Sequence, residues 1–295
     1  MRYIKDLNEG NSISGIYYCK QKVSTETKAG KPYDNLILQD KTGILDTKVW
    51  DPNSPGIGEY SAGDFIDVHG EVIMFNNQKQ AKLSRIRNAN NDDFDQSDFF
   101  PVTKKDPEKM FQELLGFINS VKSPYYKKLL EMFFVEDNEF VKIFKQASAA
   151  KTVHHGFIGG LLEHTLSVTK LCDYYTTAYP MLNRDLLITA AICHDIAKTK
   201  EIACFPVNDY TDEGQLLGHI VLGSEMIAEK VKLIPDFPAK QANELKHCIL
   251  AHHGEYEYGS PKKPALIEAV ALNFADNTDA KIIEIENNPL FYKSK

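Results

Sequence analysis

The chain has 295 residues, of which 43% are hydrophobic and 25% are charged, and its formal net charge at pH 7 is −7. These values are typical of a folded globular chain with one large domain or two smaller ones. No apolar run approaches the roughly 20 residues that a membrane-spanning helix needs, and residues 1–15 lack the apolar core of a secretory signal. We therefore expect a cytoplasmic protein with no membrane partner.

The cysteines and the distribution of charge further limit the classes of protein that this sequence fits. The five cysteines are odd in number and never form a C-x-x-C pair, which indicates reduced thiols and neither a disulfide framework nor a zinc knuckle. Residues 1–90 hold 12 basic against 11 acidic side chains, residues 91–106 hold 2 against 5, and residues 107–295 hold 20 against 25. Only the first segment does not repel polyanions, whereas a carboxylate-rich remainder is also what a divalent-metal site would produce.

The first 90 residues have the pattern of short strands separated by turns. β-branched and aromatic residues recur with partial alternation, and Gly, Pro and Asn punctuate them. Five strands in about 80 residues predict a small barrel of the OB type, with an SH3-like barrel as the alternative. The predicted strands are 11–26, 32–40, 43–51, 64–77 and 78–88.

Residues 91–106 are rich in Asn and Asp without a usable period, so we predict a linker. Asp106, Pro107 and Glu108 then form a helix start, and apolar residues follow at helical spacing. The fold class is therefore α+β and multidomain: a barrel domain at 1–90, the linker, and an all-helical domain at 107–295. Further helices are predicted at 124–134, 137–149, 159–178, 183–199, 214–232, 238–253 and 263–284.

Six polar side chains fall on the apolar faces of five predicted helices. One buried histidine is usually a hydrogen-bonded core residue, but six such groups in one helical domain would be costly without partners. Metal coordination removes that cost directly. The six predicted ligands are His164, His194, Asp195, His219, His252 and Asp276.

The donor types and their number indicate which metals to expect. Imidazole together with carboxylate favours manganese, iron or zinc over calcium. Six ligands exceed what one tetrahedral zinc takes, so we expect two divalent ions bridged by Asp195. Lys198 lies four residues after His194 and three after Asp195, on the same side of the predicted helix.

Neighbouring residues leave alternatives open. Helical phase favours His252 as the ligand and turns His253 toward substrate phosphate, although the reverse assignment stays open. His154 and His155 precede the His164 helix, where they could meet a phosphate or lie in a solvated loop. We expect Cys193 to have no nucleophilic role, because no histidine is paired with it by sequence.

The pattern H…HD…D formed by His164, His194, Asp195 and Asp276 resembles the HD superfamily of metal-dependent phosphohydrolases. His219 and His252 resemble its two-metal branch. The stretches "HHGFIGGLLEHT" and "LLITAAICHDIAKTKE", preceded by the OB-like "GKPYDNLILQDKTGILDTKVWD", are similar over nearly the whole chain to the YhaM-type 3′-to-5′ exoribonucleases of Gram-positive bacteria. One departure is Ala197, where the common motif HDIGK has glycine.

This resemblance implies a metal-dependent exoribonuclease that releases nucleoside 5′-monophosphates from the 3′ end of single-stranded RNA, or also of DNA. Manganese would be the favoured metal, with iron or zinc as alternatives. The catalytic candidates are Asp195, which would activate water with the metals, and Lys198 and His253, which would neutralise phosphate charge. A homo-oligomer is compatible with this family.

The barrel would hold the single strand on aromatic and basic side chains, as OB folds do. Because alternation must place about half of the aromatics in the core, the stacking residues cannot be separated from core residues by sequence. The nucleic-acid-binding candidates are Tyr17, Lys20, Lys22, Tyr33, Lys48 and Trp50. Two alternative functions are an HD hydrolase of free or cyclic nucleotides and a non-catalytic single-strand binding factor.

Overall fold

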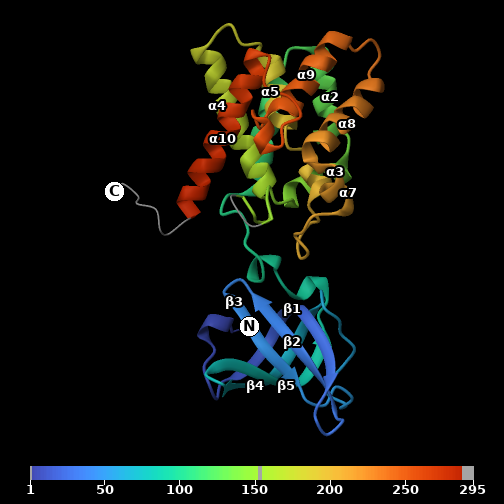
Figure 1. Cartoon of the computed structure of the whole chain (residues 1–295), viewed down its shortest axis with the longest axis vertical. Coiled ribbons are helices and arrows are strands. Elements are labelled where there is room, and N and C mark those ends of the chain that lie inside the picture. Colours follow the sequence, from blue (N-terminus) through green and yellow to red (C-terminus); the bar gives the residue numbers. More distant parts are fainter. Residues whose placement is uncertain (1, 152–154, 288–295) are drawn as a thin grey trace, which may run out of the picture. The chain divides into compact units, whose positions relative to one another are not determined.

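The computed structural model describes residues 2–151 and 155–287, and the chain divides into two compact units between Pro101 and Val102 (Figure 1). The first unit is a five-stranded closed barrel, and the second is helical. Within the described residues, no helix combines the length and the apolar character needed to cross a membrane.

The barrel has the strand order β1-β2-β3-β5-β4, closed by the pairing of β4 with β1. All neighbours are antiparallel except β3 and β5, which run parallel. This closed five-stranded arrangement is the OB topology, and it confirms the predicted barrel type over the SH3-like alternative. The strands are β1 (Ser12–Glu26), β2 (Pro32–Asp40), β3 (Gly43–Val49), β4 (Phe65–Phe75) and β5 (Gln78–Asn88).

Two nucleic-acid candidates point into the barrel. Tyr17 cannot serve as a stacking platform, because its side chain is fully buried in the core and its hydroxyl donates to the Arg2 carbonyl. The alternation of β1 shifts at a bulge between Cys19 and Gln21, which turns Lys22 inward. There the Lys22 ammonium donates to the Tyr60 carbonyl at 2.9 Å and lies 3.5 Å from the Asp34 carboxylate. Both side chains therefore stabilise the barrel itself.

The remaining candidates lie on the outside. The rings of Tyr33 and Trp50 stack with centroids 5.0 Å apart, and 49% of Trp50 is exposed. Lys48 is partly buried, and its ammonium contacts Asn35 and lies 3.6 Å from Asp46. Lys20 is exposed.

The segment predicted as a linker is only partly extended chain. It contains two 3-10 turns, η2 (Asn91–Asp93) and η3 (Gln96–Asp98), and the Phe94 ring stacks on Phe65 of the barrel at 4.1 Å. Tyr3 donates to Asp98 at 2.6 Å. Residues up to Pro101 thus pack with the barrel, and we propose that the first domain extends to this residue.

The helical unit is built around α5, whose residues 186–193 are all buried. Helices α4 and α10 pack side by side against it (Figure 1). α1 begins as predicted, because Asp106 caps the amides of Glu108 and Lys109. The helices are α1 (Pro107–Ser120), α2 (Pro124–Phe134), α3 (Asn138–Gln146), α4 (Gly160–Ala178), α5 (Arg184–Cys193), α6 (Lys198–Glu201), α7 (Asp212–Leu216), α8 (Gly218–Lys232), α9 (Ala239–Ala251) and α10 (Ile267–Asn287), with a 3-10 turn η4 (Tyr256–Tyr258).

Two predicted helices are interrupted. The pattern over 183–199 predicts one helix, but the structure breaks it after Cys193, where the amides of Ile196 and Lys198 bond three residues back to Cys193 and Asp195. The pattern over 214–232 is likewise divided at Gly218, whose φ of 73° is left-handed. The first break leaves His194 as the cap residue of α5 and Asp195 in the turn that follows it.

Candidate metal centre

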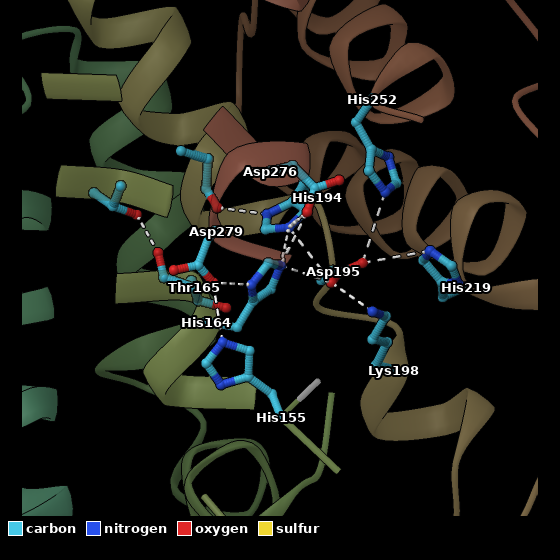
Figure 2. A network of polar contacts seen from close by, with 12 residues as sticks. His155, His164, Thr165, His194, Asp195, Lys198, His219, His252, Asp276 and Asp279 are labelled. Atoms are coloured by element: carbon cyan, nitrogen blue, oxygen red, sulfur yellow. Dashed lines mark hydrogen bonds and ion pairs between the residues drawn. The ribbon is translucent and has the colours of Figure 1, made fainter. Parts of the chain in front are cut away.

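The predicted ligands come from five places in the helical unit and meet at one point (Figure 2). His164 lies in α4, and Asp276 in α10. His194 and Asp195 follow α5, His219 is the second residue of α8, and His252 is the cap residue of α9. Side chains that periodicity places on separate apolar helix faces therefore converge in the structure.

One group of donors surrounds the Nε2 atom of His164. This atom lies 3.2 Å from Nε2 of His194, 3.1 Å from Oδ1 of Asp276 and 3.5 Å from Oδ2 of Asp195. Two imidazole nitrogens and two carboxylate oxygens at these separations form one compact set of donor atoms. We refer to these four side chains as the first donor set.

A second group lies on the other side of Asp195. Its Oδ1 atom is 3.4 Å from Nε2 of His219 and 3.7 Å from Nε2 of His252. The ligand atoms of His219, His252 and His253 lie within 4.8 Å of one another. We refer to these three histidines with Asp195 as the second donor set. Figure 2 shows Asp195 between the two groups.

The second donor set contains buried atoms that no described residue satisfies. Asp195 Oδ1, His219 Nε2 and His252 Nε2 are buried and lack a hydrogen-bond partner among the described residues. Unpaired buried polar atoms are costly, and here all three face the same point. A cation would satisfy them together, so the residues present fit a divalent metal.

Each histidine is oriented by its other ring nitrogen. An Nδ1–H that donates to a carbonyl or carboxylate oxygen leaves the Nε2 lone pair free to bind a metal. The Nδ1 partners are Ala191 O for His194 (2.8 Å), Ile249 O for His252 (2.7 Å), Tyr258 O for His253 (2.8 Å), Glu201 Oε1 for His219 (2.8 Å) and Asp279 Oδ2 for His164 (2.7 Å).

The sequence of this chain is similar to those of known proteins. The HD domain family matches residues 161–281. The "3'-5' exoribonuclease YhaM" of Bacillus velezensis is 33% identical over 280 residues, which is 94% of this chain and 87% of that protein. The protein of the same name from Bacillus subtilis is 34% identical over 92% of this chain and 86% of its own length, and that of Listeria monocytogenes 31% over 94% and 88%.

The chain belongs to the YhaM family of 3′-5′ exoribonucleases. Solved structures also resemble parts of it at low overall scores. The second OB-fold domain of replication protein A from Methanococcus maripaludis is 22% identical, covers 30% of this chain and 92% of that chain, and has a TM-score of 0.22.

The residues that match the HD domain family include every member of both donor sets. The helical unit of this YhaM-family chain therefore carries a divalent-metal site.

The pKa shifts of the histidines are consistent with metal ligation. Burial opposes a charge on His164, but hydrogen bonds with Asp276 and Asp279 outweigh it and raise the pKa of His164 to about 9. Burial lowers the pKa of His252 well below its ordinary value and also lowers the pKa of His253, so both rings are neutral. A bound cation would take the place of the His164 proton.

Lys198 supplies a fixed positive charge beside the carboxylate that joins the two sets. Its ammonium lies 2.8 Å from Oδ2 of Asp195. Burial works against the charged amine, but Asp195 outweighs burial and raises the pKa of Lys198. Against the same burial, Lys198 and His194 hold the pKa of Asp195 well below its usual range. Ala197, the departure from the common motif, is buried.

The position of His253 differs from the expected one. Helical phase turned it away from the ligands, but α9 ends at Ala251 and the His253 ring packs 4.4 Å from that of His252, centroid to centroid. Both residues can offer a ring nitrogen to one cation, so the choice of His252 over His253 as the ligand stays a prediction. Cys193 is fully buried and burial raises its pKa, which leaves a poor nucleophile as expected.

Two orienting residues were not predicted from the sequence. Asp279, one helical turn after Asp276, accepts from His164 and also contacts Nε2 of His155 at 3.0 Å. His155 is buried and not solvated, whereas His154 lies outside the described residues. Glu201, which accepts from Nδ1 of His219, is the second unpredicted residue. The Asp276–Asp279 spacing was the available signal, since residues three apart share a helix face.

A glycine makes the His155 contact possible. A Cβ on Gly160 would lie 2.0 Å from the His155 carbonyl, so only glycine lets this loop approach the start of α4. The pair of glycines in "HHGFIGG" therefore has a packing role next to the metal centre.

The metal centre opens into a cavity of about 510 Å³. That size falls in the range of small-molecule sites, which is roughly 300–1,000 Å³. Its floor includes members of both donor sets, namely His164, Asp195, His219, His253 and Asp276. A phosphate ester could therefore reach both sets from one side.

Proposed function

We propose that the protein is a metal-dependent 3′-5′ exoribonuclease that hydrolyses single-stranded RNA to nucleoside 5′-monophosphates. The observation that carries this is Asp195, whose two carboxylate oxygens face two separate donor sets. The relatives named 3′-5′ exoribonuclease support the direction of attack and the substrate class.

The donor sets suit two divalent ions. His164, His194, Asp195 and Asp276 would hold one, and Asp195, His219 and His252, joined by His253, the other. Imidazole together with carboxylate suits manganese, iron or zinc, and the family resemblance leads us to favour manganese among them. When bound, such a pair polarises a phosphate oxygen and lowers the pKa of a water molecule.

The protein's own residues position the reacting groups. In hydrolysis, a water oxygen forms a bond to the terminal phosphorus, and the bond from phosphorus to the 3′ oxygen of the preceding nucleotide breaks. That oxygen takes up a proton and becomes the new 3′-hydroxyl. Lys198 is placed to neutralise the charge that develops on the phosphate oxygens. His253 lines the cavity and would contact either the metal or the phosphate.

The barrel would bind the strand upstream of the cleaved bond. We assign this role to Tyr33, Trp50, Lys48 and Lys20 on its outer surface. Support comes from the stacked Tyr33–Trp50 pair, because an exposed aromatic face accepts any base and adjacent lysines attract phosphates. Residues 1–101 would therefore raise affinity for long strands more than for dinucleotides.

The decisive experiment follows a 5′-labelled RNA oligomer of one length. We expect a ladder that shortens from the 3′ end, stops with chelator and resumes with Mn²⁺, and that Asp195→Ala does not produce. A matched DNA strand in parallel measures the preference between the two. An intact RNA beside hydrolysis of free or cyclic nucleotides would overturn the proposal, and so would RNA binding without cleavage of any substrate.

We also propose a cytoplasmic location. It fits the five cysteines, all of which are free thiols. Size determination of the purified protein would show whether it forms the homo-oligomer that the sequence allows.

A further inference from the structure

Two exposed tyrosines line the metal cavity without a role in the chemistry described above. Tyr258 is 71% exposed and Tyr210 is 45% exposed, and both belong to the cavity wall. An exposed aromatic ring beside a catalytic centre presents a face that a flat ligand can cover. A third exposed tyrosine, Tyr256, lies on the same turn as Tyr258 but does not line the cavity.

Tyr258 is tied to a metal-ligand candidate. Its carbonyl accepts from Nδ1 of His253 at 2.8 Å, and its amide donates to the Glu255 carbonyl at 3.1 Å. Gly259 then ends the turn with a left-handed φ of 84°. The backbone of Tyr258 is therefore held relative to the second donor set, while most of the residue is exposed.

Tyr210 is also connected to the second donor set, through contacts of residues 210 and 211 with Ile202 and Glu201. It forms an isolated bridge with Ile202, and the next amide, that of Thr211, donates to the Glu201 carbonyl at 2.9 Å. Glu201 in turn orients His219. Both tyrosines are thus positioned by residues that also orient ligands of the second donor set.

The charged side chains of the cavity wall are mostly negative. Its wall contains the carboxylates of Asp195, Glu201, Glu255 and Asp276, and Lys198 is the lysine of the described lining residues. Lys198 is already paired with Asp195. Side-chain charge alone therefore does not attract a polyanion into this cavity. Bound metal ions would hold the phosphate, and base stacking, which is independent of charge, would add about 1–3 kcal/mol per base.

We propose that Tyr210 and Tyr258 form a nucleobase subsite that stacks on the base of the 3′-terminal nucleotide and places its phosphate over the donor sets. The proposal rests on the proposed exoribonuclease function and names how that site takes its substrate. Stacking tolerates every base, which suits an enzyme that removes nucleotides one after another.

The test combines enzyme variants with a substrate lacking one base. The first cleavage is timed on an RNA oligomer with a normal 3′-terminal nucleotide and on the same oligomer with an abasic 3′-terminal ribose. For the parent protein we expect kcat/KM to fall about 10- to 100-fold without the base, mainly through KM, since 1.4 kcal/mol corresponds to about tenfold.

Tyr258→Ala and Tyr210→Ala should lower kcat/KM on the normal oligomer and cleave both oligomers at nearly equal rates. Tyr258→Phe should behave like the parent, because stacking needs the ring and not the hydroxyl. Tyr256→Ala is the matched control on the same turn, and it should keep the parent's preference. Bound manganese should be equal in all these variants.

Undiminished discrimination between the two oligomers in both alanine variants would overturn the subsite. So would a parent indifferent to the missing base, or a loss of manganese in Tyr258→Ala that accounts for its loss of activity. A parent protein that shortens no RNA at all would instead overturn the function on which the subsite rests.

Discussion

Glu201 holds His219 through two hydrogen bonds to one carboxylate oxygen. Its Oε1 accepts from Nδ1 of the His219 ring at 2.8 Å and from the His219 amide at 2.9 Å. Burial opposes the charge on Glu201, but these contacts outweigh burial and hold its pKa below the usual range. The pair fixes both the ring tautomer and the start of α8.

The first prediction follows from this pair. Glu201→Ala should weaken metal binding at the second donor set by about 10- to 100-fold, because the His219 ring loses its orienting acceptor. Glu201→Gln should lose less, since its carboxamide oxygen can still accept. Manganese titration monitored by metal analysis measures this, with the exposed Glu225→Ala on α8 as control. Equal affinity in Glu201→Ala and the parent would contradict the assignment.

A second prediction concerns the bridging carboxylate. Asp195→Ala should abolish hydrolysis and remove metal from both donor sets, because its two oxygens face both. Single-strand RNA binding should stay within a few-fold of the parent, since the barrel residues are unchanged. Gel-shift affinity and metal content are measured on the same preparation. Loss of binding in step with hydrolysis would show that the metal centre itself holds the strand.

His252 and His253 provide a third test. Because their ligand atoms and that of His219 lie within 4.8 Å of one another, both His252→Ala and His253→Ala should lose part of their metal. His69→Ala, an exposed histidine of the barrel, should keep the parent's metal content. If His253→Ala retains full metal content but turns over slowly, this residue contacts the phosphate instead.

We expect Lys198 to affect turnover without affecting metal binding. Lys198→Met keeps the length of the side chain and removes the charge that faces Asp195 at 2.8 Å. A charge-assisted hydrogen bond contributes about 1.5–3 kcal/mol, so kcat should fall roughly 10- to 100-fold with metal content undiminished. A variant that loses its metal in proportion to its activity would assign Lys198 to the assembly of the site.

The fifth prediction uses the buried carboxylate of the barrel. Asp34 accepts from Tyr60 at 2.6 Å and from Ser24 at 2.5 Å and faces Lys22. Although burial raises the pKa of Asp34, these partners outweigh burial and lower it below its ordinary value. A lowered folded-state pKa contributes stability above the unfolded value of about 3.9, and that stability is lost as the pH falls below it.

Thermal unfolding of residues 1–101 should therefore show a pH dependence near 4 that Asp34→Asn reduces. Lys22→Ala should lower the melting temperature, whereas Lys20→Ala should leave it unchanged and weaken RNA binding. If Lys22→Ala weakens RNA binding at full stability, the inward orientation of Lys22 is not its functional one.

Much of the architecture follows from local pattern. Alternation and turn residues place the five strands within one or two residues of their observed bounds, and apolar spacing places His164, His219 and Asp276 on inward faces. These features depend on residues close in the chain, where side-chain direction repeats with a fixed period. His194 and Asp195 are adjacent in the chain. The prediction of a metal pair bridged by Asp195 therefore also depends on local sequence.

Other features depend on contacts between distant segments. A regular continuation of the pattern is contradicted at three places: the break after Cys193, the end of α9 before His253 and the inward turn of Lys22 at a bulge. The orienting acceptors Asp279 and Glu201 lie 115 and 18 residues from the histidines they hold. Which carboxylate meets which ring nitrogen depends on how helices pack, because a hydrogen bond requires atoms within about 3 Å and no helical period extends from one helix to another.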